Sequence, residues 1–147
     1  MSIESLNAFS MDFFSLKGKT AIVTGGNSGL GQAFAMALAK AGANIFIPSF
    51  VKDNDETKEM IEKQGVEVDF MQVDITAEGA PQKIIAACCE RFGTVDILVN
   101  NAGGGGPKPF DMPMADFRRA YELNVFSFFH LSQLVAPEME KMAVALF

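Results

Sequence analysis

The chain has 147 residues, 18 of them acidic and 12 basic, and a formal net charge of −6 at pH 7. Its length suits one domain or part of one, and a hydrophobic fraction of 49% favours a buried core over disorder. The acidic balance argues against nucleic acid or an anionic membrane as partner, because both attract clusters of Lys and Arg. We find no apolar run of the roughly 20 residues that a membrane span needs, and no basic leader typical of a secretory signal.

The two cysteines, Cys88 and Cys89, are neighbours in the sequence. Adjacent cysteines rarely form a strain-free disulfide, and a single distant His adds no zinc-binding pattern. We therefore expect free thiols, no metal site and a reducing, cytoplasmic compartment.

The first part of the chain changes from an irregular segment to regular elements. We expect residues 1–16 to form an N-terminal arm, because they show no clean hydrophobic period. Residues 20–24 form a short apolar run that predicts a buried strand, and a helix is predicted over 29–41. The apolar face expected for this helix consists of Leu30, Phe34, Ala37, Leu38 and Ala41.

The rest of the chain repeats this alternation of strand and helix. Further strands are predicted over 44–47, 66–73 and 95–99, and further helices over 53–64, 78–92 and 114–142. We expect Pro48 to close the second strand, and Pro137 to kink the last helix or remove one of its hydrogen bonds. The alternation predicts an α/β fold with one parallel sheet between two layers of helices.

A glycine-rich segment follows the first predicted strand and opens the first predicted helix. It reads Thr-Gly-Gly-Asn-Ser-Gly-Leu-Gly from residue 24 to residue 31. Glycines allow a tight turn and let backbone N–H groups approach a pyrophosphate at the positive end of a helix. The segment therefore predicts a dinucleotide site with Gly25, Asn27, Ser28, Gly29, Leu30 and Gly31 as its contacts. The alternative is a turn whose glycines only pack helix on strand.

The spacing of these glycines, Gly-x-x-x-Gly-x-Gly, resembles that of the short-chain dehydrogenase/reductase family. Asp74 matches the family's adenine-contacting Asp, and Asn124 matches the active-site Asn of its fourth main helix. The run Asn-Asn-Ala-Gly at 100–103 matches the family motif that steadies the sheet and lines the cofactor. The resemblance covers about residues 16–141. It adds Ser49, Asp74, Ile75, Asn101, Ala102 and Gly103 to the expected cofactor contacts.

The resemblance implies a Rossmann-like domain over 17–142 with strand order 3-2-1-4, of which this chain supplies about one half and a helix. It also implies oxidoreduction of a hydroxyl or carbonyl group with NAD or NADP. The choice between the two cofactors stays open. Ser49 stands where an acid would bind the ribose of NAD, and it cannot neutralise the extra phosphate of NADP either.

The family's catalytic Ser and Tyr-x-x-x-Lys have no counterpart in these residues. The single tyrosine, Tyr121, has no Lys four residues later, and we interpret both Tyr121 and His130 as ordinary helix residues. We expect a cofactor-binding fragment that does not transfer hydride. Two alternatives remain: a non-catalytic dinucleotide-binding or assembly module, and an enzyme active only with a complementing C-terminal half. A hydroxysteroid is one candidate substrate.

Two further hypotheses concern the origin of the chain. Residues 103–141 and the preceding part resemble two different bacterial members of the family, which suggests a chimera joined within 96–103. The tail 143–147 departs from the family. In the resembling family the chain continues Lys-Asn-Gly-Gly-Gly-Val-Ile-Leu. If one A base is lost from a gene that encodes this run, the shifted reading frame encodes Lys-Met-Ala-Val-Ala-Leu-Phe followed by a stop codon, which is the end of this chain. This match suggests truncation by a one-base deletion.

An incomplete sheet would leave the strand predicted at 95–99 with an open edge. Such an edge invites pairing with another chain. We therefore expect the dinucleotide as ligand, and self-association through the long helix at 114–142 or through this strand edge.

Overall fold

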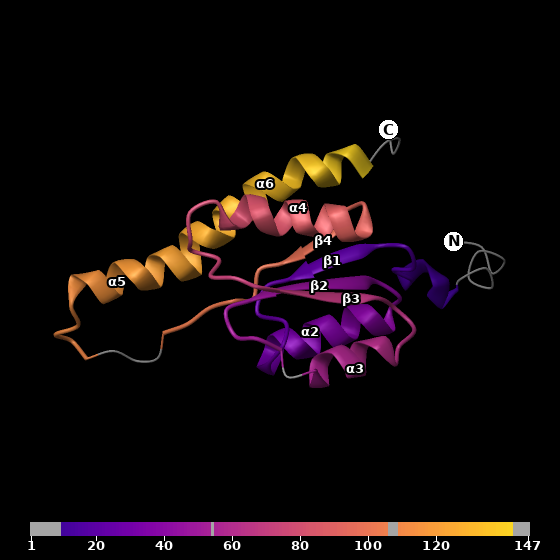
Figure 1. Cartoon of the computed structure of the whole chain (residues 1–147), viewed down its shortest axis with the longest axis horizontal. Coiled ribbons are helices and arrows are strands. Elements are labelled where there is room, and N and C mark those ends of the chain that lie inside the picture. Colours follow the sequence, from indigo (N-terminus) through magenta and orange to yellow (C-terminus); the bar gives the residue numbers. More distant parts are fainter. Residues whose placement is uncertain (1–9, 54, 106–108, 143–147) are drawn as a thin grey trace, which may run out of the picture.

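The computed structural model describes residues 10–53, 55–105 and 109–142 (Figure 1). Residues 1–9 of the predicted arm and the predicted tail 143–147 lie outside this range. The described strands are β1 (Thr20–Val23), β2 (Asn44–Ser49), β3 (Val68–Gln72) and β4 (Ile97–Val99). All neighbouring strands pair in parallel, in the order β3-β2-β1-β4. The predicted α/β, Rossmann-like sheet and its strand order are confirmed.

Helices cover both faces of this sheet. Figure 1 shows α2 (Gly29–Lys40) and α3 (Glu56–Glu62) on one face, and α4 (Ala80–Phe92) and α6 (Ser127–Met142) on the other. Along β1, Ala21 and Val23 face the first pair of helices and Ile22 faces the second, as alternation along a strand requires. The core therefore has two compartments, one on each side of the sheet.

Helix α2 buries a different face from the one the apolar pattern predicts. Its buried residues are Gly31, Ala35 and Ala39, whereas Leu30 is 74% exposed and Phe34 44% exposed. A Cβ at position 31 would overlap the Gly25 carbonyl oxygen, so only a glycine can face the loop there. This close backbone contact sets the rotation of α2 about its axis and turns the small residues inward.

Strand β2 continues through Pro48, where the sequence predicts its end. Pro48 pairs with Met71 of β3, and its carbonyl accepts a 2.8 Å hydrogen bond from the Gly25 amide. Strand β2 pairs with β1 only as far as Phe46, because β1 then ends and continues into the glycine loop. The missing N–H of Pro48 therefore breaks no ladder hydrogen bond.

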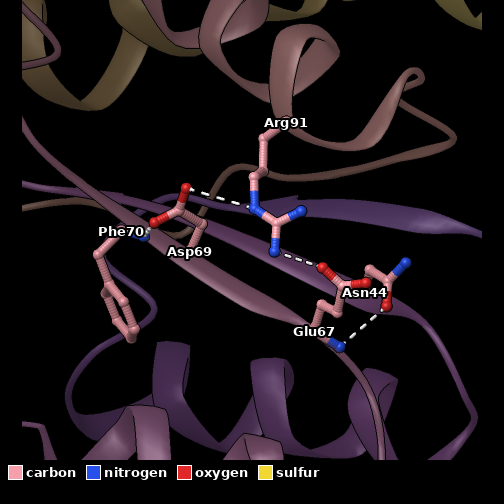
Figure 2. A network of polar contacts seen from close by, with 5 residues as sticks. All are labelled: Asn44, Glu67, Asp69, Phe70 and Arg91. Atoms are coloured by element: carbon pink, nitrogen blue, oxygen red, sulfur yellow. Dashed lines mark hydrogen bonds and ion pairs between the residues drawn. The ribbon is translucent and has the colours of Figure 1, made fainter.

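A polar network fastens α4 to the outer part of the sheet (Figure 2). Arg91 forms an ion pair with Glu67, and its Nε lies 3.9 Å from a carboxylate oxygen of Asp69. The backbone amide of Glu67 donates to the Asn44 side chain at 3.0 Å, which extends the network to β2. Gly93 ends α4 in the left-handed conformation, in agreement with the predicted helix end at 92.

The predicted helix over 114–142 is continuous but not uniform. It consists of α5 (Met114–Tyr121), a π-helical turn (Glu122–Phe126) and α6, and it runs on through Pro137. None of the residues of α5 is buried, and Figure 1 shows this helix extending beyond the sheet. Buried Leu131 and Val135 instead dock α6 on the core beside α4.

Among the described residues, no helix is both long enough and apolar enough to cross a membrane. The same residues contain no group of three or more His, Cys, Asp or Glu side chains that could hold a metal ion.

Candidate dinucleotide-binding site

The glycine loop lies where β1 ends and α2 begins, at the carboxyl ends of the parallel strands. Gly25 has a φ of +63° and Gly29 a φ of +54°, values that favour glycine. At Gly31 a side chain would collide with Gly25 and also with Nδ2 of Asn101. The loop is thus closed tightly enough to present backbone N–H groups at the start of α2, as a pyrophosphate site requires.

A buried hydroxyl ties this loop to the segment after β4. Thr24 Oγ1 accepts hydrogen bonds from the backbone amides of Asn101 and Ala102, both at 2.9 Å, and donates to the Val99 carbonyl at 3.3 Å. Asn101 Nδ2 in turn donates to the Thr24 carbonyl at 3.0 Å. These bonds link the ends of two neighbouring strands, and so Asn101 and Ala102 keep a constant position beside the glycine loop.

The end of β2 carries no charged group on this side. Ser49 donates its hydroxyl hydrogen to Asn27 Oδ1 at 2.8 Å, and Asn27 Nδ2 donates to the Val51 carbonyl at 2.9 Å. The Ser49 side chain is therefore occupied by the loop residue Asn27. Its position next to the glycine loop agrees with the prediction, and its chemistry leaves the choice between NAD and NADP open.

Asp74 holds a fixed negative charge at the end of β3. Its Oδ1 accepts from the Thr76 hydroxyl at 2.7 Å and from the Thr76 amide at 2.9 Å. These two bonds, with a smaller contribution from the positive charge of Arg119, hold the pKa of Asp74 below its usual value, although partial burial acts in the opposite direction. Asp74 is therefore ionised at neutral pH.

These groups surround a cleft of about 430 Å³. Every predicted cofactor contact except Gly29 lines it, and Gly29 forms the first residue of α2 beside it. The residues that line the cleft are Gly25, Asn27, Ser28, Leu30, Gly31, Ser49, Phe50, Val51, Val73, Asp74, Ile75, Thr76, Asn101, Ala102, Gly103, Arg119 and Leu123. The cleft thus joins segments from all four strand ends with one side of the long helix.

Asn124 is not among the residues that line the cleft. It lies in the π turn, where Nδ2 donates to the Gly104 carbonyl at 2.9 Å and to the Ala120 carbonyl at 2.8 Å. Its Oδ1 accepts from the Gly104 amide at 3.2 Å. In this structure Asn124 anchors the loop after β4 to the long helix.

Sequence reasoning missed several residues of the cleft. Phe50 and Val51 directly follow Ser49, and Thr76 completes an Asp-x-Thr turn of a kind that local sequence can reveal. Arg119 and Leu123 carry no comparable signal. They reach the cleft only because of the way the long helix passes over it.

A family profile described as short chain dehydrogenase matches residues 19–145. The chain belongs to the short chain dehydrogenase family. The Escherichia coli K12 protein called uncharacterized oxidoreductase YgcW is 79% identical over 140 residues, which cover 95% of this chain and 54% of YgcW. The 7alpha-hydroxysteroid dehydrogenase of the same strain is 53% identical over 134 residues, which cover 90% of this chain and 52% of that enzyme.

Solved structures of the short chain dehydrogenase family agree with the fold. A crystal structure of hydroxysteroid dehydrogenase from Escherichia coli matches with a TM-score of 0.85 and 52% identity, over 90% of this chain and 57% of that one. A 7 alpha-hydroxysteroid dehydrogenase complexed with NADH and 7-oxo glycochenodeoxycholic acid matches with a TM-score of 0.82 and 51% identity, over 91% of this chain and 53% of that one. The chain spans about half the length of the curated relatives it matches. The match to YgcW includes both sides of Gly103, and the chimera stays a prediction.

Proposed function

We propose that this chain binds NAD or NADP in the cleft around the glycine loop. The observation that carries the proposal is the close approach of Gly31 to Gly25, which leaves the start of α2 open to a pyrophosphate. Asp74 offers an ionised carboxylate to the adenosine part of the ligand. Asn101 and Ala102 would line the path of the bound dinucleotide, because Thr24 holds their backbone amides in place.

A titration with NADH and NADPH tests this proposal. The chain has no Trp, so the emission of the reduced cofactors can be followed directly. We expect both to bind and Gly31→Ala to weaken binding at least about tenfold, because the new Cβ must displace the Gly25 backbone. Gly93→Ala, which strains the end of α4 remote from the cleft, controls for lost stability. Equal affinity of Gly31→Ala and the unaltered chain would contradict the proposal.

The chain by itself should not transfer hydride. A bound nicotinamide cofactor would give hydride to a carbonyl carbon or take it from a hydroxyl-bearing carbon, but a protein group must donate a proton to the carbonyl oxygen or remove one from the hydroxyl. Tyr121 is the single tyrosine, and the residue four positions after it is Val125, not the Lys of a Tyr-x-x-x-Lys motif. The Tyr121 ring packs 4.9 Å from the Phe117 ring and 6.5 Å from the Phe126 ring, between centroids. We propose that the chain is a cofactor-binding fragment of a cytoplasmic oxidoreductase.

Complementation tests the catalytic part of this proposal. The chain is mixed with a C-terminal segment of 7alpha-hydroxysteroid dehydrogenase that begins at the fifth strand, and oxidation of a 7alpha-hydroxy steroid is followed by NADH formation. We expect no turnover by the chain alone. Turnover with the added segment would favour an enzyme that needs its second half, with a hydroxysteroid substrate as the relatives suggest. Turnover by the chain alone would refute the inactive fragment.

A second candidate function is assembly, and two surfaces favour it. Strand β4 lies at the edge of the described sheet and is only partly buried. The long helix exposes Phe126 at 54% and Phe129 at 69%. We propose self-association through one of these surfaces, since open strand edges and exposed apolar groups both favour pairing. Light scattering should show a dimer or larger species that Phe129→Glu dissociates if the helix pairs, and that Phe34→Glu on α2 does not.

A further inference from the structure

The long helix contributes one cation to the cleft. Arg119 of α5 lines it, and Asp74 is the other ionised side chain among the lining residues. Within the described part of the chain, the Arg119 side chain forms neither an ion pair nor a hydrogen bond. A guanidinium with no partner that faces a concave site is available to a ligand.

The opposite charges of Arg119 and Asp74 interact electrostatically. Arg119 contributes to the lowered pKa of Asp74, so its positive charge lies near enough to act on that carboxylate. Both side chains line the same cleft, and no ion pair joins them in the described structure.

The positive charge of Arg119 changes the net charge of the side chains that line the cleft. A dinucleotide carries two negative charges on its pyrophosphate, and the whole chain carries −6. With Arg119 the side chains that line the cleft sum to zero, but without it Asp74 alone would repel an anion. The start of α2 adds only the partial positive charge of a helix end.

We propose that Arg119 is the residue whose charge makes the cleft accept a phosphate-bearing adenine ligand, a role that rests on the dinucleotide binding proposed above. The guanidinium offsets the carboxylate of Asp74 and attracts the phosphate groups. Its neighbour Arg118 is also exposed on α5 and carries the same charge, but it does not line the cleft. A comparison of variants at Arg118 and Arg119 therefore distinguishes a charge effect within the cleft from an effect of the net charge of the chain.

The experiment compares Arg119→Gln with Arg118→Gln, which lower the net charge equally. Calorimetric titration with ADP-ribose at 50 mM NaCl should show about a 5- to 20-fold weaker affinity for Arg119→Gln, and less than a twofold change for Arg118→Gln. The loss should shrink at 300 mM NaCl and be absent with adenosine, which has no phosphate. Arg119→Lys should recover most of the affinity, because it keeps the charge.

Two outcomes would overturn the proposed role of Arg119 without overturning dinucleotide binding. One is an equal loss of ADP-ribose affinity in both Gln variants, and the other is a loss for adenosine as large as that for ADP-ribose. Failure of the unaltered chain to bind ADP-ribose would overturn dinucleotide binding itself. A ligand-free NMR titration of Asp74 tells these failures apart. Its pKa should rise in Arg119→Gln and not in Arg118→Gln, and no rise in Arg119→Gln shows that Arg119 does not face the cleft.

Discussion

The sheet body at 19–105 and the long helix at 109–142 contribute to the cleft in different ways. In the body, short loops at strand ends are fastened to one another, as Thr24 is to Asn101 and Ala102. In the helix, α6 docks on the core through buried Leu131, whereas α5 has no buried residue and reaches the cleft with single side chains. The glycine loop therefore has its position set locally, whereas Arg119 owes its position to the contact made by Leu131, about three turns further along the helix.

The largest effect is expected where the helix docks on the body. Leu131→Ala removes a fully buried side chain from the compartment shared with α4, and should lower the free energy of unfolding by about 2–5 kcal/mol. Urea unfolding followed by circular dichroism measures this change. Gln133→Ala, at an exposed position of the same helix, should change it by no more than about 0.5 kcal/mol. Similar losses in both variants would mean that α6 does not dock as described.

The next largest effect concerns the fastening of the strand ends. Thr24→Val keeps the shape of the side chain but removes the acceptor of two backbone amides, and should cost about 1–3 kcal/mol of unfolding free energy. Thr94→Val is the matched control, because its buried hydroxyl has no hydrogen-bond partner in the described structure. We expect that control to be neutral or slightly stabilising in the same urea experiment. A costly Thr94→Val together with a neutral Thr24→Val would reverse the interpretation.

A pH dependence is expected from Asp74 in the body. The hydroxyl and amide of Thr76 hold its folded-state pKa below the ordinary value of 3.8, so the ionised form stabilises the fold. This stabilisation is complete above the unfolded pKa and is lost as the pH falls through the lowered folded value. The difference in unfolding free energy between the unaltered chain and Asp74→Asn should therefore be constant above about pH 5 and shrink in acid. Thr76→Val should weaken this dependence, and an unchanged profile would argue against the two hydrogen bonds.

The smallest effect is expected in the projecting helix. Phe117→Ala removes a ring that is 42% exposed and packs on the Tyr121 ring one turn later in the same helix. Thermal unfolding should show a change within about 0.5 kcal/mol. A larger loss would mean that another copy of the chain covers α5, and a dilution series would then show a midpoint that depends on concentration.

Sequence patterns predicted the central strands β1 and β2 because these strands are buried on both faces. Runs such as that around Ile22 are apolar throughout, and glycines mark their ends. The glycine loop and Asp74 were predictable for a related reason, since both depend on neighbours only a few residues away. In the structure both line one cleft.

The errors arose where a distant contact overrides a local pattern. Apolar spacing indicated Leu30 and Phe34 as the buried face of α2, but the contact between Gly31 and Gly25 turns that face outward. Pro48 suggested a strand end, but β2 continues there because the pairing of β2 with β1 has already ended at Phe46. Arg119 could not be found from its neighbours, because its place depends on the docking of a helix that begins after the loop.

The π turn at Glu122–Phe126 sets the phase between the two ends of the long helix. The amide of Ser127 bonds to the carbonyl of Glu122, five residues back, so this turn holds one residue more than an α-helical turn. One residue corresponds to a rotation of about 100° in an α-helix. Removing Val125, with Leu131 still docked, would convert the turn to α-helical geometry and rotate Arg119 by about 100° around the helix axis. The one extra residue in the π turn thus allows the long helix to direct Leu131 at the core and Arg119 at the cleft.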